Sequence, residues 1–389
     1  MNRKKFVAIN NIPTPYRIHF FALLNKELEK RGWDFEVWYL AKTEMWRYWR
    51  FQPEDFQFPH MFGRGIHPYL KGSHFHINPD LIYKSWQTPA DVILICGGWF
   101  IPTIVASTVL SKLRYTPRVY MWAESNLQSM QHSQGPVSFI RSKIFNAYDG
   151  FVIPGIKAKS YLETTFPNYQ GKTLIYLPNV VNEELFHDQV SLLRKQRGSL
   201  RQELQIAHNK RVLITLSRLI PIKGIMEMLM GVAQLNETKQ ERLLLLVAGD
   251  GQQRDEIEEF IQNQHLNECV RLLGNLEEAA VIRYLALADG FILPSIKDPS
   301  PLSAIEAAFA GLPLLLSSNV GNHPELLTHE ENGWLFEPRQ INSIQQVLEL
   351  FLEADEAELD RMGINSCQVA NNHFHTKVVV PRFVKELLT

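Results

Sequence analysis

The chain has 389 residues, 45% of them hydrophobic and 21% charged, and Lys+Arg 40 against Asp+Glu 41 give a formal net charge of -1. A domain usually has roughly 100 to 200 residues, so a single small module is excluded and two domains are expected. The near-zero charge offers no overall positive field to a polyanion, which argues against a dedicated nucleic-acid binder.

Cysteines and apolar segments exclude further classes of protein. Cys96, Cys269 and Cys367 show no Cys-x-x-Cys spacing and leave one thiol unpaired, so neither a disulfide framework nor a structural zinc site is expected. The apolar run 6–9 is too short for a signal-peptide core, and no segment approaches the ~20 apolar residues of a membrane span. We expect a cytoplasmic protein in a reducing compartment, at most peripheral at the inner membrane face.

The first half of the chain alternates β-branched and aromatic runs with amphipathic stretches. Helices are predicted at residues 18–31 and 103–113. The predicted strands, which have the composition of strands buried on both faces, are residues 5–10, 35–40, 91–96, 118–122, 150–154 and 173–177. This alternation indicates βαβ units in a parallel sheet, so residues 1–182 are predicted to form one Rossmann-like domain.

The second half repeats the pattern, and residues 210–365 are predicted to form a second Rossmann-like domain. Its predicted strands are residues 211–216, 243–248, 270–273, 290–294, 312–316 and 334–336. Residues 183–209 are predicted to be a linker with a solvated connecting helix, and its basic residues are interpreted as solvated charges: Arg194, Lys195, Arg197 and Arg201. Apolar positions in the segment 366–389 predict that it packs back on the N-terminal domain.

The predicted fold class is therefore α/β, with two doubly wound Rossmann-like domains facing each other across a cleft. Ligands of open parallel sheets bind outside the carboxyl ends of the strands. Arg218 and Lys223 follow the strand 211–216 and precede a helical stretch. A guanidinium fork and an ammonium in such a loop suit a diphosphate, although two solvated charges of an ordinary loop would give the same pattern.

Gly249 and Gly251 follow the strand 243–248. They either form a turn only or let a ligand approach the backbone closely.

A short helix is predicted after the strand 290–294, with Ser300 as its N-cap and Pro301 as its first residue. The amides of Leu302 and Ser303 would then be available to a phosphate. Glu306, in the second turn, could accept two hydrogen bonds from a vicinal diol such as a ribose.

Asp298 lies in the loop before this helix. A carboxylate near a helix N-terminus is common for dipole reasons alone, so a structural role stays open. Asp298 and Glu306 could also be the acid and nucleophile of a glycosidase, although nothing in the sequence indicates a separate substrate groove.

In combination these motifs resemble the family 4 glycosyltransferases (glycosyl transferases group 1), retaining enzymes of the GT-B fold that use sugar nucleotides. The resemblance covers the C-terminal half and rests on the order and spacing of Ser217-Arg-Leu-x-x-x-Lys223-Gly, Gly249-Asp-Gly251, Gly290-Phe-Ile-Leu-Pro-Ser295, Asp298-x7-Glu306 with Ala-Ala-Phe-Ala-Gly-Leu-Pro, and Asn332-Gly-Trp-Leu-Phe. In the N-terminal half, Leu177-Pro-Asn179-Val-Val-Asn182 resembles the family hinge with two substitutions.

The resemblance implies that the C-terminal domain holds the donor. By motif, Arg218 and Lys223 would contact the diphosphate, Glu306 the ribose hydroxyls and Asp298 the transferred sugar. The other donor-binding residues that it implies are Gly249, Gly251, Ser295, Leu302 and Ser303.

Two departures from the family pattern bear on catalysis. After the strand 118–122, either Glu124 or Ser125 lies where many relatives place an active-site histidine, and Asp298 replaces the usual glutamate. The predicted catalytic residues are Asp298, Arg218, Lys223 and Glu124. The sequence has no Asp-x-Asp triplet, so neither a metal nor another cofactor is expected, and preorganised cations would stabilise the departing diphosphate.

The N-terminal half supplies the predicted acceptor side. Pro13, Tyr16 and Arg17 lie in a segment that resembles the first acceptor-side loop of the family. Trp46 and Trp49, in an aromatic and basic segment, could form a ridge against anionic lipid headgroups or a stacking platform for a glycan. A long loop with its aromatic side chains packed beneath it is the alternative.

The resemblance implies a retaining, metal-independent hexosyltransferase. It would move a sugar from a UDP- or GDP-type donor to a glycan or lipid-linked saccharide, in cell-surface polysaccharide synthesis. Two alternatives stay open: a catalytically silent subunit or scaffold with this fold, and a phosphorylase or epimerase.

Overall fold

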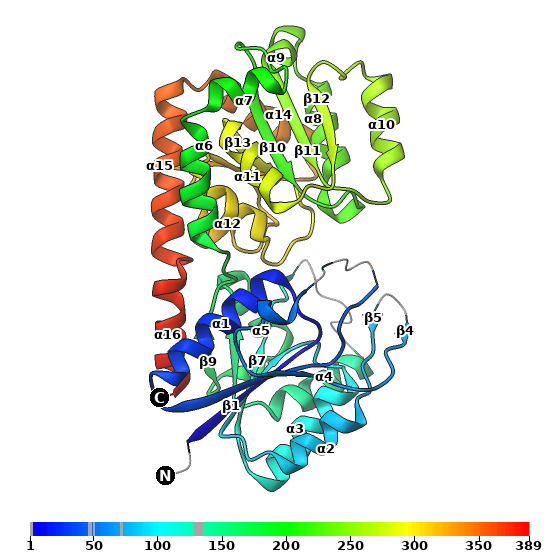
Figure 1. The fold of residues 1–389 in the computed structure, drawn as a ribbon. Helices are drawn as coiled ribbons and strands as arrows, with labels where there is room; N and C mark the ends of the chain where they lie inside the picture. The colour runs from blue at the N-terminus through cyan, green and yellow to red at the C-terminus, as the bar shows by residue number, and fades with distance from the viewer. Residues whose placement is uncertain (1–2, 46–48, 50, 71–72, 128–134, 389) are drawn as a thin grey trace. The chain divides into compact units, whose positions relative to one another are not determined.

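The computed structural model describes residues 3–45, 49, 51–70, 73–127 and 135–388. The chain divides into two compact units. Unit 1 comprises Met1–Pro154, Ala158–Pro178 and Thr376–Thr389, and unit 2 comprises Gly155–Lys157 and Asn179–His375. Each unit contains one large parallel sheet covered by helices, which confirms the predicted α/β class with two Rossmann-like halves (Figure 1).

The sheet of unit 1 has the strand order β3-β2-β1-β6-β7-β8-β9. Its strands are β1 (Lys4–Asn10), β2 (Trp33–Tyr39), β3 (His60–Phe62), β6 (Val92–Cys96), β7 (Arg118–Trp122), β8 (Gly150–Ile153) and β9 (Thr173–Tyr176). A small antiparallel hairpin consists of β4 (Tyr69–Leu70) and β5 (Ser73–His74).

Helices cover both faces of this sheet. They are α1 (Pro15–Glu29), α2 (Pro79–Gln87), α3 (Pro102–Arg114), α4 (Pro136–Asn146), α5 (Ile156–Thr165) and α16 (Thr376–Leu388), with 3-10 turns at Pro53–Asp55 and Pro167–Tyr169. Alternate residues of a strand face opposite sides of the sheet. Val7 therefore packs in a core with Ile104 of α3, whereas Phe6 faces α1, with its ring centroid 5.5 Å from that of Phe35.

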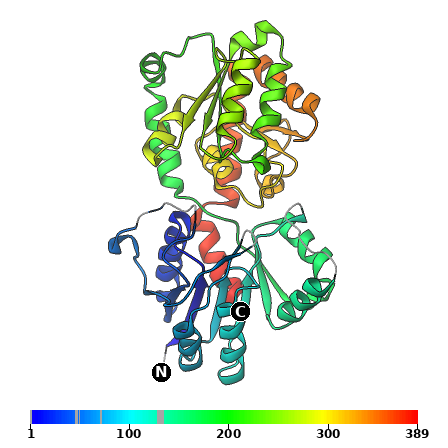
Figure 2. The same cartoon turned by 90° about the vertical axis from the view of Figure 1, so that its right-hand side faces the viewer.

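The C-terminal helix α16 belongs to unit 1 and packs beside α1, as Figures 1 and 2 show, with the rings of Phe20 and Phe383 6.0 Å apart. The segment expected to pack there begins at residue 366, but residues 366–375 belong to unit 2. The reason is that α15 (Glu356–His373) continues without a break beyond residue 366.

The sheet of unit 2 has the order β12-β11-β10-β13-β14-β15, so the strand order reverses between β10 and β13. Its strands are β10 (Arg211–Leu216), β11 (Leu243–Ala248), β12 (Val270–Gly274), β13 (Gly290–Leu293), β14 (Leu314–Ser317) and β15 (Gly333–Phe336). Buried residues alternate between two cores: Val212 and Ile214 lie in one and Leu213 in the other, as expected for a sheet covered on both faces.

The helices of unit 2 follow these strands in chain order. They are α8 (Ile225–Ala233), α9 (Glu237–Arg242), α10 (Arg254–Asn263), α11 (Glu278–Leu287), α12 (Leu302–Phe309), α13 (His323–Leu326), α14 (Ile341–Glu353) and α15, with a 3-10 turn at Pro221–Lys223.

Two elements of unit 1 differ from the sequence prediction. Helix α1 begins at Pro15 rather than at residue 18, because proline fits the first turn, where no amide donor is needed. Tyr16 and Arg17 therefore lie on a helix and not in a loop. The edge strand β3 was not among the predicted strands, since three residues are too few to show a period.

The linker helix predicted to be solvated is packed instead. Its segments are Leu185–Gln189, α6 (Val190–Arg194) and α7 (Arg197–Glu203), and their apolar residues enter a core of unit 2. Arg194 donates to the Leu285 carbonyl at 3.4 Å, while Arg197 donates to the Leu287 carbonyl at 3.1 Å and pairs with Asp289. The arginines thus satisfy the last carbonyls of α11, which have no partner within their own helix.

Candidate functional site

Four loops of unit 2 leave the carboxyl ends of its central strands, where the strand order reverses. They are residues 217–224 after β10, 249–253 after β11, 294–301 after β13 and 318–322 after β14. Open parallel sheets bind ligands at this position, because strands on either side of the reversal lead to loops that diverge.

Backbone hydrogen bonds join these loops to one another. The β10 loop is bonded to the β11 loop by the amide of Leu219 and the carbonyl of Asp250, 3.0 Å apart. It is bonded to the β13 loop by the amide of Ile296 and the carbonyl of Ile222, also 3.0 Å apart. The β14 loop donates from Gly321 to the carbonyl of Asp298 at 2.8 Å. The loops that carry the predicted donor-binding residues therefore form one connected surface.

An ion pair between Lys223 and Asp298 crosses from the β10 loop to the β13 loop. Both side chains are largely buried, with 15% and 11% of their surfaces exposed. The structure thus brings together the lysine predicted to contact a diphosphate and the carboxylate predicted to face the transferred sugar. This pairing partly neutralises the lysine charge.

Arg218 is an exposed residue of the β10 loop. The backbone that approaches Gly249 and Gly251 is that of the same loop: a Cβ would lie 1.9 Å from the Ser217 carbonyl oxygen at Gly249 and 2.3 Å from that of Leu219 at Gly251. The glycines are thus required because the two loops pack closely against each other. The sequence had indicated either a turn or a place where a ligand approaches the backbone.

The helix α12 begins at Leu302, and its N-cap is Pro301 rather than the predicted Ser300. Pro301 has an extended ψ of 130°, and its carbonyl accepts a hydrogen bond from Asn322 Nδ2 at 3.0 Å. No side chain caps the helix, so the first-turn amides of Leu302 and Ser303 have no capping acceptor. The Ser300 Oγ and Asn322 Oδ1 atoms are buried without a hydrogen-bond partner among the described residues.

Glu306 lies in the second turn of α12 and is half-buried. Burial, with a smaller contribution from the negative charge of Glu278, raises the pKa of Glu306 to about 7. A carboxylate held in this way gains from hydrogen-bond donors such as vicinal hydroxyls, because they stabilise its charged form.

Ser295 is fully buried and joins the β13 loop to the end of strand β14. Its carbonyl accepts from Ser317 Oγ at 2.5 Å, and its own Oγ has no partner among the described residues. The hydroxyl of Ser295 is therefore not accessible to a sugar-nucleotide donor. This differs from the donor-binding role that the resemblance implies for Ser295.

In unit 1, Arg17 and Glu124 form an ion pair of 3.0 Å between the start of α1 and the loop after β7. Arg17 is only 3% exposed, and its guanidinium carbon lies 3.4 Å from the ring centroid of Trp122. Burial raises the pKa of Tyr16, and the neighbouring Arg17 charge opposes that rise. The structure thus places Glu124 with the acceptor-side residues Tyr16 and Arg17.

Pro13 and Trp49 line a common hollow of unit 1, of about 390 Å³. Trp49 is 40% exposed, whereas Phe56, Phe58 and nearby rings pack against one another. The segment therefore combines an exposed aromatic residue with packed ones. Trp46 lies outside the described residues.

Asn322 and Gly321 were not identified from the sequence, although they hold the start of α12 and the Asp298 backbone. A Cβ at Gly321 would lie 1.7 Å from the Pro299 carbonyl oxygen. The turn Asn319-Val-Gly-Asn322 after a buried strand is the signal that points to this loop.

Among the described residues, no three His, Cys, Asp or Glu side chains are grouped so that they could hold a metal ion. No helix within the described ranges is long and apolar enough to cross a membrane.

Residues 196–368 match the family model of Glycosyl transferases group 1. N-acetyl-alpha-D-glucosaminyl L-malate synthase of Bacillus anthracis is 25% identical over 199 residues, which cover 51% of this chain and 50% of that protein. The 2-deoxystreptamine N-acetyl-D-glucosaminyltransferase of Niallia circulans is 34% identical over 135 residues, which cover 35% of this chain and 34% of that protein. The chain thus spans half or less of the length of these curated relatives.

The solved structure of Anabaena Alr3699/HepE in complex with UDP and glucose resembles the whole chain, with a TM-score of 0.74, 18% identity and 99% of each chain covered. This likeness shows the fold, the GT-B arrangement of Rossmann-like halves. Residues 196–368 thus match the model of Glycosyl transferases group 1, and the chain as a whole has the GT-B fold.

Proposed function

We propose that the chain is a glycosyltransferase. It transfers a sugar from a nucleotide diphosphate sugar, of the UDP or GDP type, to a glycan or lipid-linked acceptor in cell-surface polysaccharide synthesis. The observation that carries the proposal is the Lys223–Asp298 pair at the strand reversal of unit 2, inside the segment that matches the family model. A UDP-type donor is further supported by the HepE complex, which contains UDP.

The residues of unit 2 divide the donor between them. Arg218 and Lys223 provide positive charge for the diphosphate, the first turn of α12 provides amides, and Glu306 accepts from the ribose hydroxyls. Asp298 orients Lys223 and faces the transferred sugar. No metal is required, because these fixed cations and amides stabilise the charge of the departing diphosphate.

We further propose transfer with retention. The bond between the anomeric carbon and the diphosphate oxygen breaks, and the acceptor oxygen bonds to the same face of the sugar. The acceptor proton passes to the departing diphosphate. Glu124, held by Arg17, is the acidic side chain of unit 1 assigned to this reaction.

The test is turnover of UDP-, GDP-, ADP- and dTDP-sugars with glycan acceptors in EDTA. Arg218→Gln with Lys223→Gln should lower kcat/KM by about 100-fold or more, the effect of removing transition-state donors. Lys239→Gln with Arg271→Gln removes two cations of unit 2 outside the four loops and should leave kcat/KM unchanged.

Other outcomes would identify the alternatives. Turnover that depends on inorganic phosphate indicates a phosphorylase, and isomerisation without an acceptor indicates an epimerase. A folded protein that neither binds nor turns over any nucleotide sugar would be a silent subunit and would contradict the proposal.

A further inference from the structure

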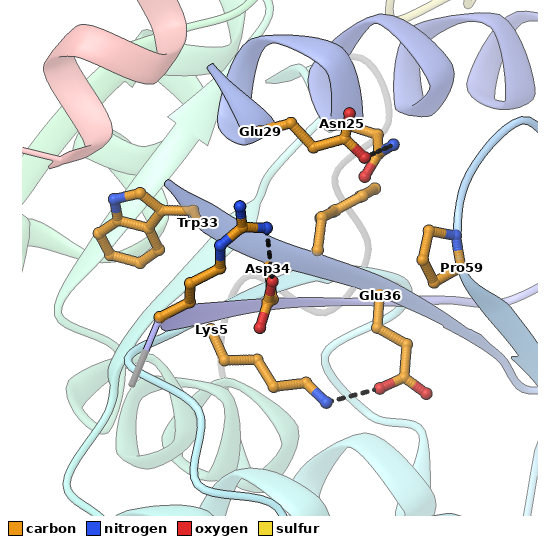
Figure 3. Close-up of a pocket in the computed structure, with 9 residues that line it drawn as sticks. Lys5, Asn25, Glu29, Trp33, Asp34, Glu36 and Pro59 are labelled. Carbon is orange, nitrogen blue, oxygen red and sulfur yellow. Dashed lines mark hydrogen bonds and ion pairs between the residues drawn. The ribbon is translucent and has the colours of Figure 1, made fainter. Parts of the chain in front are cut away.

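Two hollows of unit 1 contain cations and differ in how those charges are paired. The hollow in Figure 3, of about 250 Å³, lies at the amino ends of β1 and β2. Lys5 pairs there with Glu36 at 2.9 Å (Figure 3), and Arg3 pairs with Asp34 at 3.5 Å. Its cations already have carboxylate partners, so it attracts an anion weakly.

The second hollow, of about 530 Å³, lies at the carboxyl ends of β2 and β3, the ligand-binding edge of a parallel sheet. Lys42, Arg64 and His67 line it, and none of its described lining residues is acidic. Lys42 and Arg64 are both exposed, and neither forms an ion pair with an acidic side chain in the described part of the chain. We call it the cationic hollow.

A hydrogen-bonded chain through the buried His76 fixes His67 at this hollow. His76 is 0% exposed, and its Nε2 lies 2.9 Å from Glu44 Oε1 while its Nδ1 lies 2.9 Å from His67 Nδ1. Burial, followed by His76 and His74, lowers the pKa of His67 below its ordinary value. This shift favours the neutral form of His67, and Lys42 and Arg64 supply the cations of the hollow.

The cationic hollow adjoins the aromatic-lined hollow that contains Pro13 and Trp49, and both share Lys42, Thr43 and Phe62. Aromatic faces stack against sugar rings and apolar groups. A ligand that spans both hollows would thus have an anionic group beside an uncharged one.

We propose that the cationic hollow binds the phosphate group of a phosphate ester, through Lys42 and Arg64, with the esterified group against the aromatic hollow. A phosphate dianion matches the two cations in charge, and a guanidinium fork suits its oxygens. The identification of this ester as the acceptor rests on the proposed function, whereas the phosphate site itself does not.

The test is calorimetric titration with inorganic phosphate. It is done in a background of Arg218→Gln and Lys223→Gln, so that the cations of unit 2 do not contribute. Adding Lys42→Gln and Arg64→Gln should weaken phosphate binding about tenfold or more, because charged hydrogen bonds are lost. The matched control, Arg3→Gln with Lys5→Gln, removes the same charge from the hollow of Figure 3 and should bind phosphate as the background protein does.

Three results would overturn the proposal: no phosphate binding by the background protein, unchanged binding after Lys42→Gln and Arg64→Gln, or an equal loss in the control. Thermal unfolding checks that the variants are folded, and the single substitutions, each at an exposed residue, give the same test with smaller losses.

Two further arms separate the sources of phosphate. Tighter binding of glycerol 3-phosphate than of glycerol, lost with Lys42→Gln and Arg64→Gln, indicates a small phosphorylated ligand. The lipid arm measures whether the protein sediments with vesicles. Sedimentation with vesicles of phosphatidylcholine and phosphatidic acid, but not with phosphatidylcholine alone, indicates a lipid headgroup if Lys42→Gln with Arg64→Gln abolishes it. Both results support the site. If the unsubstituted protein does not bind UDP, this result counts against the proposed function. It does not affect the proposal that the cationic hollow binds phosphate.

Discussion

Lys223 and Asp298 show how single residues set the charge of the donor site. Their ion pair is largely buried, so each side chain controls the electrostatic environment of the other. An arriving diphosphate must share Lys223 with Asp298, and removing the carboxylate charge should release the lysine.

Asp298→Asn is therefore expected to bind nucleoside diphosphate at least as tightly as the wild type while its turnover falls about tenfold or more, because sugar-facing charge is lost. Lys223→Gln should weaken binding itself. Calorimetry and kcat measured in parallel check this pattern, and equal losses of affinity in the two variants would contradict the assigned roles.

Glu306 makes a prediction about pH. Its pKa is raised from an ordinary 4.5 to about 7, so the stabilising contribution of the neutral form is complete below pH 4.5 and is lost as the pH rises through 7. We compare the free energy of unfolding of the wild type with that of Glu306→Gln, both without nucleotide. From pH 5 to pH 8, the wild-type value should decrease by about 1 to 3 kcal/mol more than the value of the variant. Urea unfolding at four pH values tests this, and parallel curves would refute it.

Arg17 and Glu124 differ in burial although they form one ion pair. Arg17 is 3% exposed and packs on the Trp122 ring, so its loss removes buried contacts as well as the ion pair, whereas a glutamine in place of the 35% exposed Glu124 keeps an acceptor for the guanidinium. Arg17→Met should lower the free energy of unfolding by about 1 to 3 kcal/mol, and Glu124→Gln by less. The opposite order in urea unfolding would show that the pair is not organised as described.

At the scale of elements, the packing of the β10 loop on the β11 loop depends on Gly249, whose φ is +138° and whose Cβ position is occupied by the Ser217 carbonyl. Gly249→Ala should cost about 1 to 3 kcal/mol of stability and weaken nucleotide binding, since both loops must shift.

Gly198 provides the matched control, because it lies in α7 and, apart from its chain neighbours and the backbone of its own helix, no atom lies within 4 Å of its Cβ position. Gly198→Ala should leave stability unchanged or raise it. If the two substitutions had equal effects in urea unfolding and calorimetry, the close packing of the loops would not be the cause.

The sequence predicts the long strands well because strands buried on both faces are continuous apolar runs; β10 and β11 have the predicted bounds. It does not predict β3, whose three residues become a strand only through pairing with β2. The linker prediction fails for a related reason. Its arginines appear solvated in sequence, and only the fold places the carbonyl end of α11 beside them.

At the scale of the whole molecule, Arg218, Lys223, Gly249, Gly251 and Asp298 lie in loops at one edge of the unit 2 sheet, because each follows a strand and parallel strands end at one edge. The contacts between loops could not be predicted: nothing in the sequence pairs Lys223 with Asp298 or Asn322 with Pro301. In unit 1, the cationic hollow depends on β3 and on a buried histidine, His76, that gives no periodic signal.

The measurement that tests the account most directly is calorimetric titration of UDP, GDP, ADP and dTDP in EDTA. It compares the wild type, Arg218→Gln with Lys223→Gln, and the control Lys239→Gln with Arg271→Gln. We predict that one nucleotide binds the wild type and the control alike, and binds the loop variant at least about tenfold more weakly. Binding that is unaffected by the loop variant, or absent from a folded wild type, would contradict a metal-independent donor site in unit 2.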